Sequence, residues 1–163
     1  MPALSDKIGA ALAPPHPVMQ AESAPSVSPR SSGRALILVV EQDPQMRRLE
    51  RYFLEQAGFS VEFADDGNQG LETARRLRPD IVVAEILVAG LDGLSVCRAL
   101  KSDPETCSIV VLIFSILAAE ERARAAGADA FVRKPLDDIR LVSSIEALLA
   151  EHRRGRSNGD ATP

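Results

Sequence analysis

The chain has 163 residues, of which 45% are hydrophobic and 26% are charged, values that are ordinary for a soluble globular protein. Its net charge of −4 gives no global basic field that would draw it to nucleic acid. No apolar stretch approaches the roughly 20 residues of a membrane span, and two cysteines, Cys97 and Cys107, are too few for a disulfide framework. We therefore expect a cytoplasmic protein whose partners include no nucleic acid and no membrane.

The composition divides the chain into three parts. Residues 1–33 are rich in Pro, Ala and Ser, and such a segment cannot bury enough apolar surface to offset its ordering entropy. We predict a disordered tail over 1–33, although a docking peptide remains an alternative there. The folded domain is predicted over 34–152 and a flexible C-terminal tail over 153–163. This tail is too short for a helix-turn-helix, so we expect a stand-alone domain.

The folded part begins with two clear signals. The continuous apolar run 35–40 predicts a strand that is buried on both faces. Asp43-Pro44 then predicts a helix start, with Asp as the N-cap and Pro at the first helical position. The inner face of this helix is predicted from four apolar residues at helical spacing, Met46, Leu49, Phe53 and Ala57.

The remaining elements continue to alternate between strand and helix. The patterns predict, in chain order, a strand over 59–63, a helix from Asp66-Gly67, a strand over 81–84, a helix over 93–101, a strand over 109–114, a helix over 118–126, a strand over 128–133 and a last helix from Asp137-Asp138. This alternation predicts an α/β fold of the flavodoxin-like (βα)5 type, a doubly wound parallel sheet with strand order 2-1-3-4-5. Its switch point lies between the first and third strands, where Glu41, Gln42 and Glu85 should converge.

Four motifs lie at the predicted carboxyl ends of the strands: Glu41-Gln42, Glu85 with the following Asp92-Gly93 loop, Ser115, and Lys134-Pro135. With the element order, they resemble the receiver domains of bacterial response regulators over residues 34–152. In that family two acids and an acceptor Asp hold Mg²⁺, the Asp accepts a phosphoryl group, and a Lys and a Ser/Thr hydroxyl bind that group.

The resemblance assigns a role to each matching residue. It implies that Glu85 is the phosphoacceptor equivalent and that Glu41 and Gln42 are the acidic-pocket equivalents. Ser115 and Lys134 match the phosphoryl-binding residues, and Phe131 matches an aromatic whose rotamer follows the switch. Asp92 is predicted to turn the loop and cap the third helix instead of accepting phosphate.

Three departures from the family weaken this chemistry. Gln42 is neutral, which removes one negative charge from a site for a hard cation. Glu85 is one methylene longer than Asp, and a misplacement of roughly 1 Å can cost on the order of 100-fold in rate. The segment from Ser115 to Gly127 is also shorter than expected. We therefore expect no catalysis, no cofactor and no bound metal, the residues Glu41, Gln42 and Glu85 forming a degenerate metal site.

The sequence thus favours an atypical stand-alone receiver, or pseudo-receiver, that acts in two-component or phosphorelay signalling by protein–protein interaction, independently of phosphorylation. Its partner would be another signalling protein, such as a histidine kinase or an effector, and the broad apolar stripe of the last helix suggests a homodimer. The alternative is a functional phosphoacceptor that a histidine kinase phosphorylates with Mg²⁺. Glu85 could mimic a phosphorylated state, form a merely structural ion pair with Lys134, or retain some phosphoryl acceptance.

Overall fold

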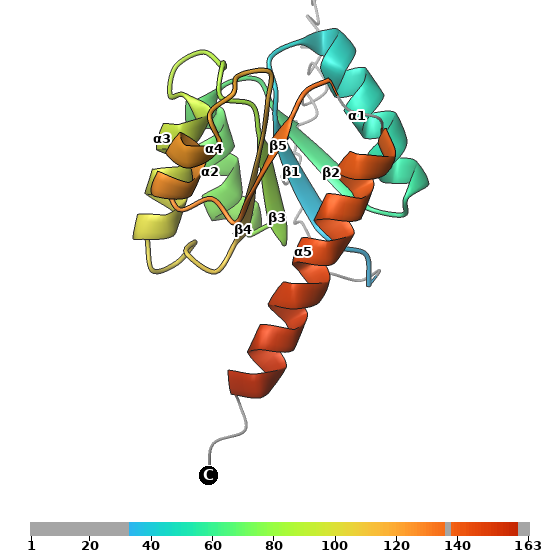
Figure 1. Cartoon of the computed structure of the whole chain (residues 1–163), viewed down its shortest axis with the longest axis vertical. Helices are drawn as coiled ribbons and strands as arrows, with labels where there is room; N and C mark the ends of the chain where they lie inside the picture. The colour runs from blue at the N-terminus through green and yellow to red at the C-terminus, as the bar shows by residue number, and fades with distance from the viewer. Residues whose placement is uncertain (1–32, 136–137, 160–163) are drawn as a thin grey trace, which may run out of the picture. The chain divides into compact units, whose positions relative to one another are not determined.

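The structure, a computed structural model, describes residues 33–135 and 138–159. Five parallel strands form one sheet in the order β2-β1-β3-β4-β5 (Figure 1), which confirms the predicted fold class and strand order. The strands are β1 Leu36–Val40, β2 Ser60–Ala64, β3 Ile81–Ala84, β4 Val110–Ser115 and β5 Ala130–Arg133. The helices are α1 Pro44–Gln56, α2 Gly67–Leu77, α3 Gly93–Ser102, α4 Glu120–Ala125 and α5 Asp138–Gly159.

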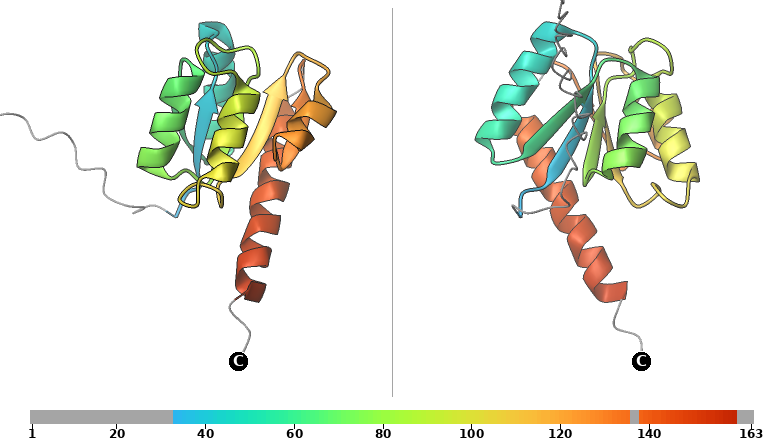
Figure 2. Two further views of the ribbon diagram at one scale, coloured as in Figure 1. Left: turned by 90° about the vertical axis from the view of Figure 1, so that its left-hand side faces the viewer. Right: turned by 180° about the vertical axis from the view of Figure 1, so that it is seen from behind.

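Helices cover both faces of the sheet (Figure 2). One core lies between the sheet and α2, α3 and α4, and includes Leu38, Val82 and Leu100. The other lies between the sheet and α1 and α5, and includes Val39, Leu54 and Ile145. Burial on both faces explains why the central strands are continuous apolar runs instead of alternating ones.

The register of the strands positions the polar residues that follow them. Val40 of β1 pairs with Ala84 of β3, so the next residues, Glu41 and Glu85, leave neighbouring strands at the same level. Ser115 of β4 pairs with Arg133 of β5, which brings Lys134 to the same edge. The carboxyl edge of the sheet therefore collects all four of these residues.

Two aspartates fix the helices that begin at this edge. The Asp43 carboxylate accepts hydrogen bonds from the amides of Gln45 and Met46 at the start of α1. Asp92 accepts from the amides of Leu94 and Ser95 at the start of α3. Both predicted N-caps are confirmed, and each leaves its carboxylate committed to a helix terminus.

The inner face of α1 differs from the prediction. Leu49 is 47% exposed, whereas the fully inward positions are Glu50 and Leu54. Met46, Glu50 and Leu54 form a series with a spacing of four residues, and this ridge faces the sheet in place of the ridge through Leu49. A carboxylate therefore occupies a core-facing position of α1.

The C-terminal end of the domain lies further along the chain than predicted. α5 continues to Gly159, beyond the predicted domain boundary at residue 152 (Figure 1). The predicted N-terminal tail, apart from Gly33, lies outside the described residues, as do residues 160–163. Val142 and Leu148 pack against the same core as the rest of α5, so its broad apolar stripe is used within the domain and gives no support to a homodimer.

None of the helices within the described residues is sufficiently long and apolar to span a membrane.

Candidate functional site

A cluster of buried charged side chains lies at the carboxyl edge of the sheet. Glu41, Glu50, Glu85 and Lys134 are each at most 7% exposed, and the Ser115 side chain beside them is fully buried. Four of these five residues follow or end strands, and Glu50 enters from α1. One ammonium group therefore serves three carboxylates in a region from which solvent is largely excluded.

Lys134 is the centre of this cluster. Its Nζ lies 2.6 Å from Glu41 Oε2, 3.3 Å from Glu85 Oε2 and 3.7 Å from Glu50 Oε1. It also lies 4.8 Å from the centroid of the Phe114 ring, within the range of a cation–π contact. Burial alone would lower the pKa of Lys134, but the hydrogen bond to Glu41 and the surrounding carboxylates outweigh it and raise this pKa above its usual value.

Glu85 uses its two carboxylate oxygens in different ways. Oε1 accepts hydrogen bonds from the amides of Ile86 and Leu87, at 2.6 and 3.1 Å, and a short one from the Ser115 hydroxyl. Only Oε2 faces Lys134. The extra methylene of Glu85 thus allows the carboxylate to turn back over its own loop and reach Ser115 while remaining near the lysine.

The backbone beneath Glu85 is tightly packed. A Cβ atom added at Gly93 would lie 2.2 Å from the carbonyl oxygen of Glu85, so only glycine permits the start of α3 to approach the acid this closely. Gly93 also donates its amide to the Ile86 carbonyl. The Asp92-Gly93 pair therefore holds the loop that presents Glu85.

Ser115 connects Glu85 to the segment that follows β4. Its hydroxyl oxygen accepts from the Leu117 amide at 3.2 Å, while its carbonyl accepts from the Lys134 amide at 2.8 Å. The Ser115 hydroxyl therefore contacts both the Glu85 carboxylate and the β4–α4 segment. The segment ends in α4, a helix of only six residues.

Gln42 does not join the charged cluster. Its side chain is exposed, and Oε1 accepts a hydrogen bond from the Ala89 amide at 3.0 Å, in the loop that follows Glu85. Glu41 Oε1 accepts from the Asp43 amide while its Oε2 faces Lys134. Gln42 thus ties the end of β1 to the β3–α3 loop, and the pocket charge comes from the other residues.

The donor set of this pocket fits Mg²⁺ poorly in the observed arrangement. Glu41 and Glu85 each turn one oxygen to the Lys134 ammonium and the other to an amide or hydroxyl donor. Among the described residues, no three His, Cys, Asp or Glu side chains are grouped to hold a metal ion. A hard cation would have to displace Lys134 and several hydrogen bonds to bind here.

Glu50 is the site residue that the sequence analysis missed. It lies on α1, and its Oε2 is buried without a hydrogen-bond partner among the described residues. Burial raises the pKa of the Glu50 carboxyl from 4.5 to about 7; Lys134 opposes this rise, and Glu41 and Glu85 add to it. Met46, Glu50 and Leu54 share a four-residue spacing in the sequence, but this spacing alone does not show that their ridge faces the core.

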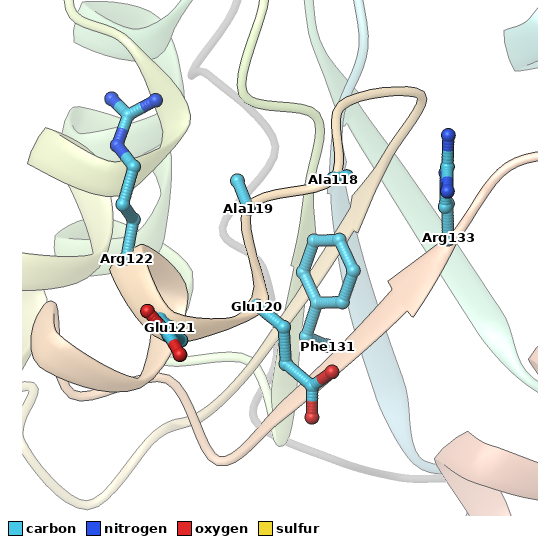
Figure 3. A pocket seen from close by; sticks show the side chains of 7 residues that line it. All are labelled: Ala118, Ala119, Glu120, Glu121, Arg122, Phe131 and Arg133. Atoms are coloured by element: carbon cyan, nitrogen blue, oxygen red, sulfur yellow. The ribbon is translucent and has the colours of Figure 1, made fainter.

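Phe131 lies away from the charged cluster, on β5. It is half-buried, packs against the core between the sheet and helices α2, α3 and α4, and lines a pocket of about 560 Å³. The other lining residues come from the β4–α4 segment and the end of β5 (Figure 3): Ala118, Ala119, Glu120, Glu121, Arg122 and Arg133. Phe131 thus borders the segment that Ser115 begins.

The sequence matches the response regulator receiver domain model over residues 37–146. The chain belongs to this family. This receiver domain is 39% identical over 129 residues to the transcriptional regulatory protein CseB of Streptomyces avermitilis, a match that covers 76% of the chain and 52% of the relative. It is 32% identical over 116 residues to the DNA-binding response regulator MtrA of Mycolicibacterium smegmatis, covering 71% of the chain and 51% of the relative.

Solved structures agree with the family assignment. The signal receiver domain of a signal transduction histidine kinase from Syntrophus aciditrophicus is 30% identical, with a TM-score of 0.67, and the match covers 79% of this chain and 95% of that one. The chain spans about half the length of the curated relatives it matches.

One prediction about partners is contradicted by these relatives. Composition led us to expect no nucleic acid, but the relatives are transcriptional and DNA-binding regulators. Net charge could not support that expectation, because it describes only the surface of this chain, whereas the match covers about half the length of these DNA-binding and transcriptional relatives.

Proposed function

We propose that this receiver domain is a signalling module of a two-component system and that its output reaches transcription. The family assignment and the transcriptional regulators among its relatives support this function. The module would act on a DNA-binding domain or protein by contact, not by catalysis. The connection from Glu85 through Ser115 to the β4–α4 segment supplies a route from the pocket to a contact surface.

Two mechanisms could set the state of this module. The relatives are named as a transcriptional regulatory protein and a DNA-binding response regulator. These names support a phosphoacceptor that a histidine kinase phosphorylates better than they support a phosphate-independent receiver. The pocket geometry supports a state held by Glu85 itself. Its carboxylate contacts both the Ser115 hydroxyl and the Lys134 ammonium, the two groups that the family uses for a phosphoryl group.

The geometric mechanism rests mainly on charge. Phosphorylation would convert the Glu85 carboxylate into an acyl phosphate, which carries about two negative charges, and would thus add roughly one net negative charge to a pocket in which Glu41, Glu50 and Glu85 already surround one ammonium. Like charges in a poorly solvated region repel strongly. From the chain's own residues we therefore propose that Glu85 fixes a phosphate-independent state, with phosphorylation as the second candidate function.

One experiment separates the two mechanisms. The purified chain is incubated with Mg²⁺ and acetyl phosphate, and intact mass spectrometry follows the addition of a phosphoryl group. We expect no substantial addition to the unmodified chain. A phosphorylated species that disappears in Glu85→Gln but persists in Glu62→Gln, at an exposed glutamate of β2, would establish the phosphoacceptor instead.

A second measurement tests whether Glu85 holds a distinct state. In Glu85→Gln we expect amide NMR shifts to spread through Leu117, α4 and Phe131, because the charge that orders the Ser115 hydroxyl is lost. Glu62→Gln should leave those amides unchanged. Shifts confined to the immediate neighbours of Glu85 would show that the residue is only structural.

A further inference from the structure

The charges of the buried pocket do not balance. Three carboxylates, on Glu41, Glu50 and Glu85, face one ammonium, on Lys134, and none of these residues is more than 7% exposed. The phenyl ring of Phe114 forms an apolar wall beside the ammonium. Buried charges that lack a partner are costly, and ionisable groups in such places commonly become neutral. The pocket therefore requires a further positive charge.

The hydrogen bonds identify the carboxylate that would take it. Both oxygens of Glu41 have partners, the Asp43 amide and Lys134. Both oxygens of Glu85 also have partners, the two loop amides with the Ser115 hydroxyl on one side and Lys134 on the other. Glu50 differs, because Oε1 lies 3.7 Å from Lys134 and Oε2 has no partner among the described residues.

We infer that the pocket is a proton-binding site: Glu50 carries one proton in the folded domain, and gain or loss of this proton controls the pairing of Lys134 with Glu41 and Glu85. With the proton bound, Lys134 has two carboxylates to satisfy. When the proton leaves, Glu50 competes for the ammonium and repels Glu41 and Glu85. This proposal concerns a group outside the four family motifs, and it applies to the chain with an unphosphorylated Glu85.

The groups that face Glu50 come from three other elements. They are Glu41 after β1, Glu85 after β3 and Lys134 after β5. The net effect of burial and of these charges places the pKa of Glu50 at about 7 instead of 4.5, so its proton affinity is roughly 300-fold above that of a solvated glutamate. The site would therefore exchange its proton in the range in which cells regulate their pH.

Carbon-13 NMR of the glutamate side-chain carboxyls, recorded on the full chain from about pH 5 to pH 9, tests the assignment. We expect one carboxyl signal to titrate with a midpoint near 7 and to be absent from Glu50→Gln. Glu55→Gln provides the matched control, since Glu55 is an exposed glutamate on the same helix. A spectrum in which every glutamate titrates below about pH 6, or a high titration that survives in Glu50→Gln, would overturn the proposal.

The coupling to Lys134 has its own readout. The amides of Leu87 and Ser115, which flank the Glu85 carboxylate, should shift with the midpoint of Glu50 in the unmodified chain and lose this titration in Glu50→Gln. Glu50→Leu, which removes both charge and polarity, should behave in the same way if the amide variant folds poorly. Amides that remain unchanged while Glu50 titrates would refute the control of Lys134.

Discussion

Replacing Glu50 with Gln should make this receiver domain more stable at neutral and alkaline pH. The folded pKa of about 7 lies above the ordinary value of 4.5, so between these values the folded state holds a proton that the unfolded state has lost. Stability therefore falls as pH rises through this window and levels off above it. At about 1.4 kcal/mol per pKa unit, the loss is about 3 kcal/mol.

Glutamine has nearly the same shape as a protonated glutamic acid but does not ionise. At pH 5 the variant and the original chain should therefore have similar free energies of unfolding. At pH 8 the variant should be more stable by about 3 kcal/mol, or less if water enters the pocket and solvates the ionised group. Urea unfolding followed by far-ultraviolet circular dichroism at pH 5, 6, 7 and 8 measures this difference.

The difference between variant and original chain isolates Glu50, because other titrating groups contribute equally to both. Glu55→Gln, on the exposed side of α1, should leave the pH profile of stability unchanged. A Glu50→Gln variant that is less stable at pH 8, or a difference that does not depend on pH, would refute the reasoning. The first result would mean that the Glu50 carboxylate is ionised and favourably paired with Lys134, and the second that Glu50 does not exchange a proton on folding between pH 5 and pH 8.

Three further predictions concern the rest of the site. Mg²⁺ at concentrations below about a millimolar should produce no saturable amide NMR shifts in the pocket, because the Lys134 ammonium pairs with the carboxylates of Glu41 and Glu85. Gln42→Asp should strengthen Mg²⁺ binding. Saturable shifts in the unmodified chain in this range would contradict the prediction. Lys134→Ala should cost roughly 3–5 kcal/mol of stability. Double-mutant cycles should give a larger coupling energy for Lys134 with Glu41 than with Glu85, because the lysine Nζ lies 2.6 Å from Glu41 and 3.3 Å from Glu85. Equal coupling energies would contradict this difference. Asp92→Ala should lower the free energy of unfolding by about 1 kcal/mol through loss of the α3 cap. Burial would raise the pKa of Asp92, but the hydrogen bonds from Ser95 and Leu94 outweigh it and lower this pKa, so the contribution of the cap should vanish as pH falls through the lowered value. An unchanged urea midpoint near neutrality would exclude the cap.

The fold could be predicted because its signals are local. Continuous apolar runs identify strands covered on both faces, and the caps Asp43 and Asp92 identify where helices begin. The register then follows from the topology, since parallel strands end at one edge and their next residues, such as Glu41 and Glu85, must meet there. The convergence of these residues was accordingly available from sequence.

The buried position of Glu50, by contrast, could not be predicted from the sequence. A glutamate on an amphipathic helix ordinarily lies on the solvated side, so the sequence favours the neighbouring Leu49 as the core residue. The packing of α1 on the sheet decides that Leu49 is 47% exposed and Glu50 only 3%. Which ridge of a helix packs inward depends on the contacts between whole elements, which short patterns do not specify.

The position of Lys134 changes what Glu85 can be expected to do. Glu85 is the predicted partner of Lys134, but Glu41 is the nearer one, with its carboxylate oxygen 2.6 Å from the lysine Nζ against 3.3 Å for Glu85. Loss of the Glu85 carboxylate would therefore leave Lys134 paired, whereas the Ser115 hydroxyl would lose its acceptor. Because Ser115 also accepts from the Leu117 amide, its hydroxyl gives Glu85 a direct connection to the β4–α4 segment. The lysine then serves chiefly to offset the charge of the buried Glu41 and Glu85 carboxylates, whereas the serine connects the pocket to that segment.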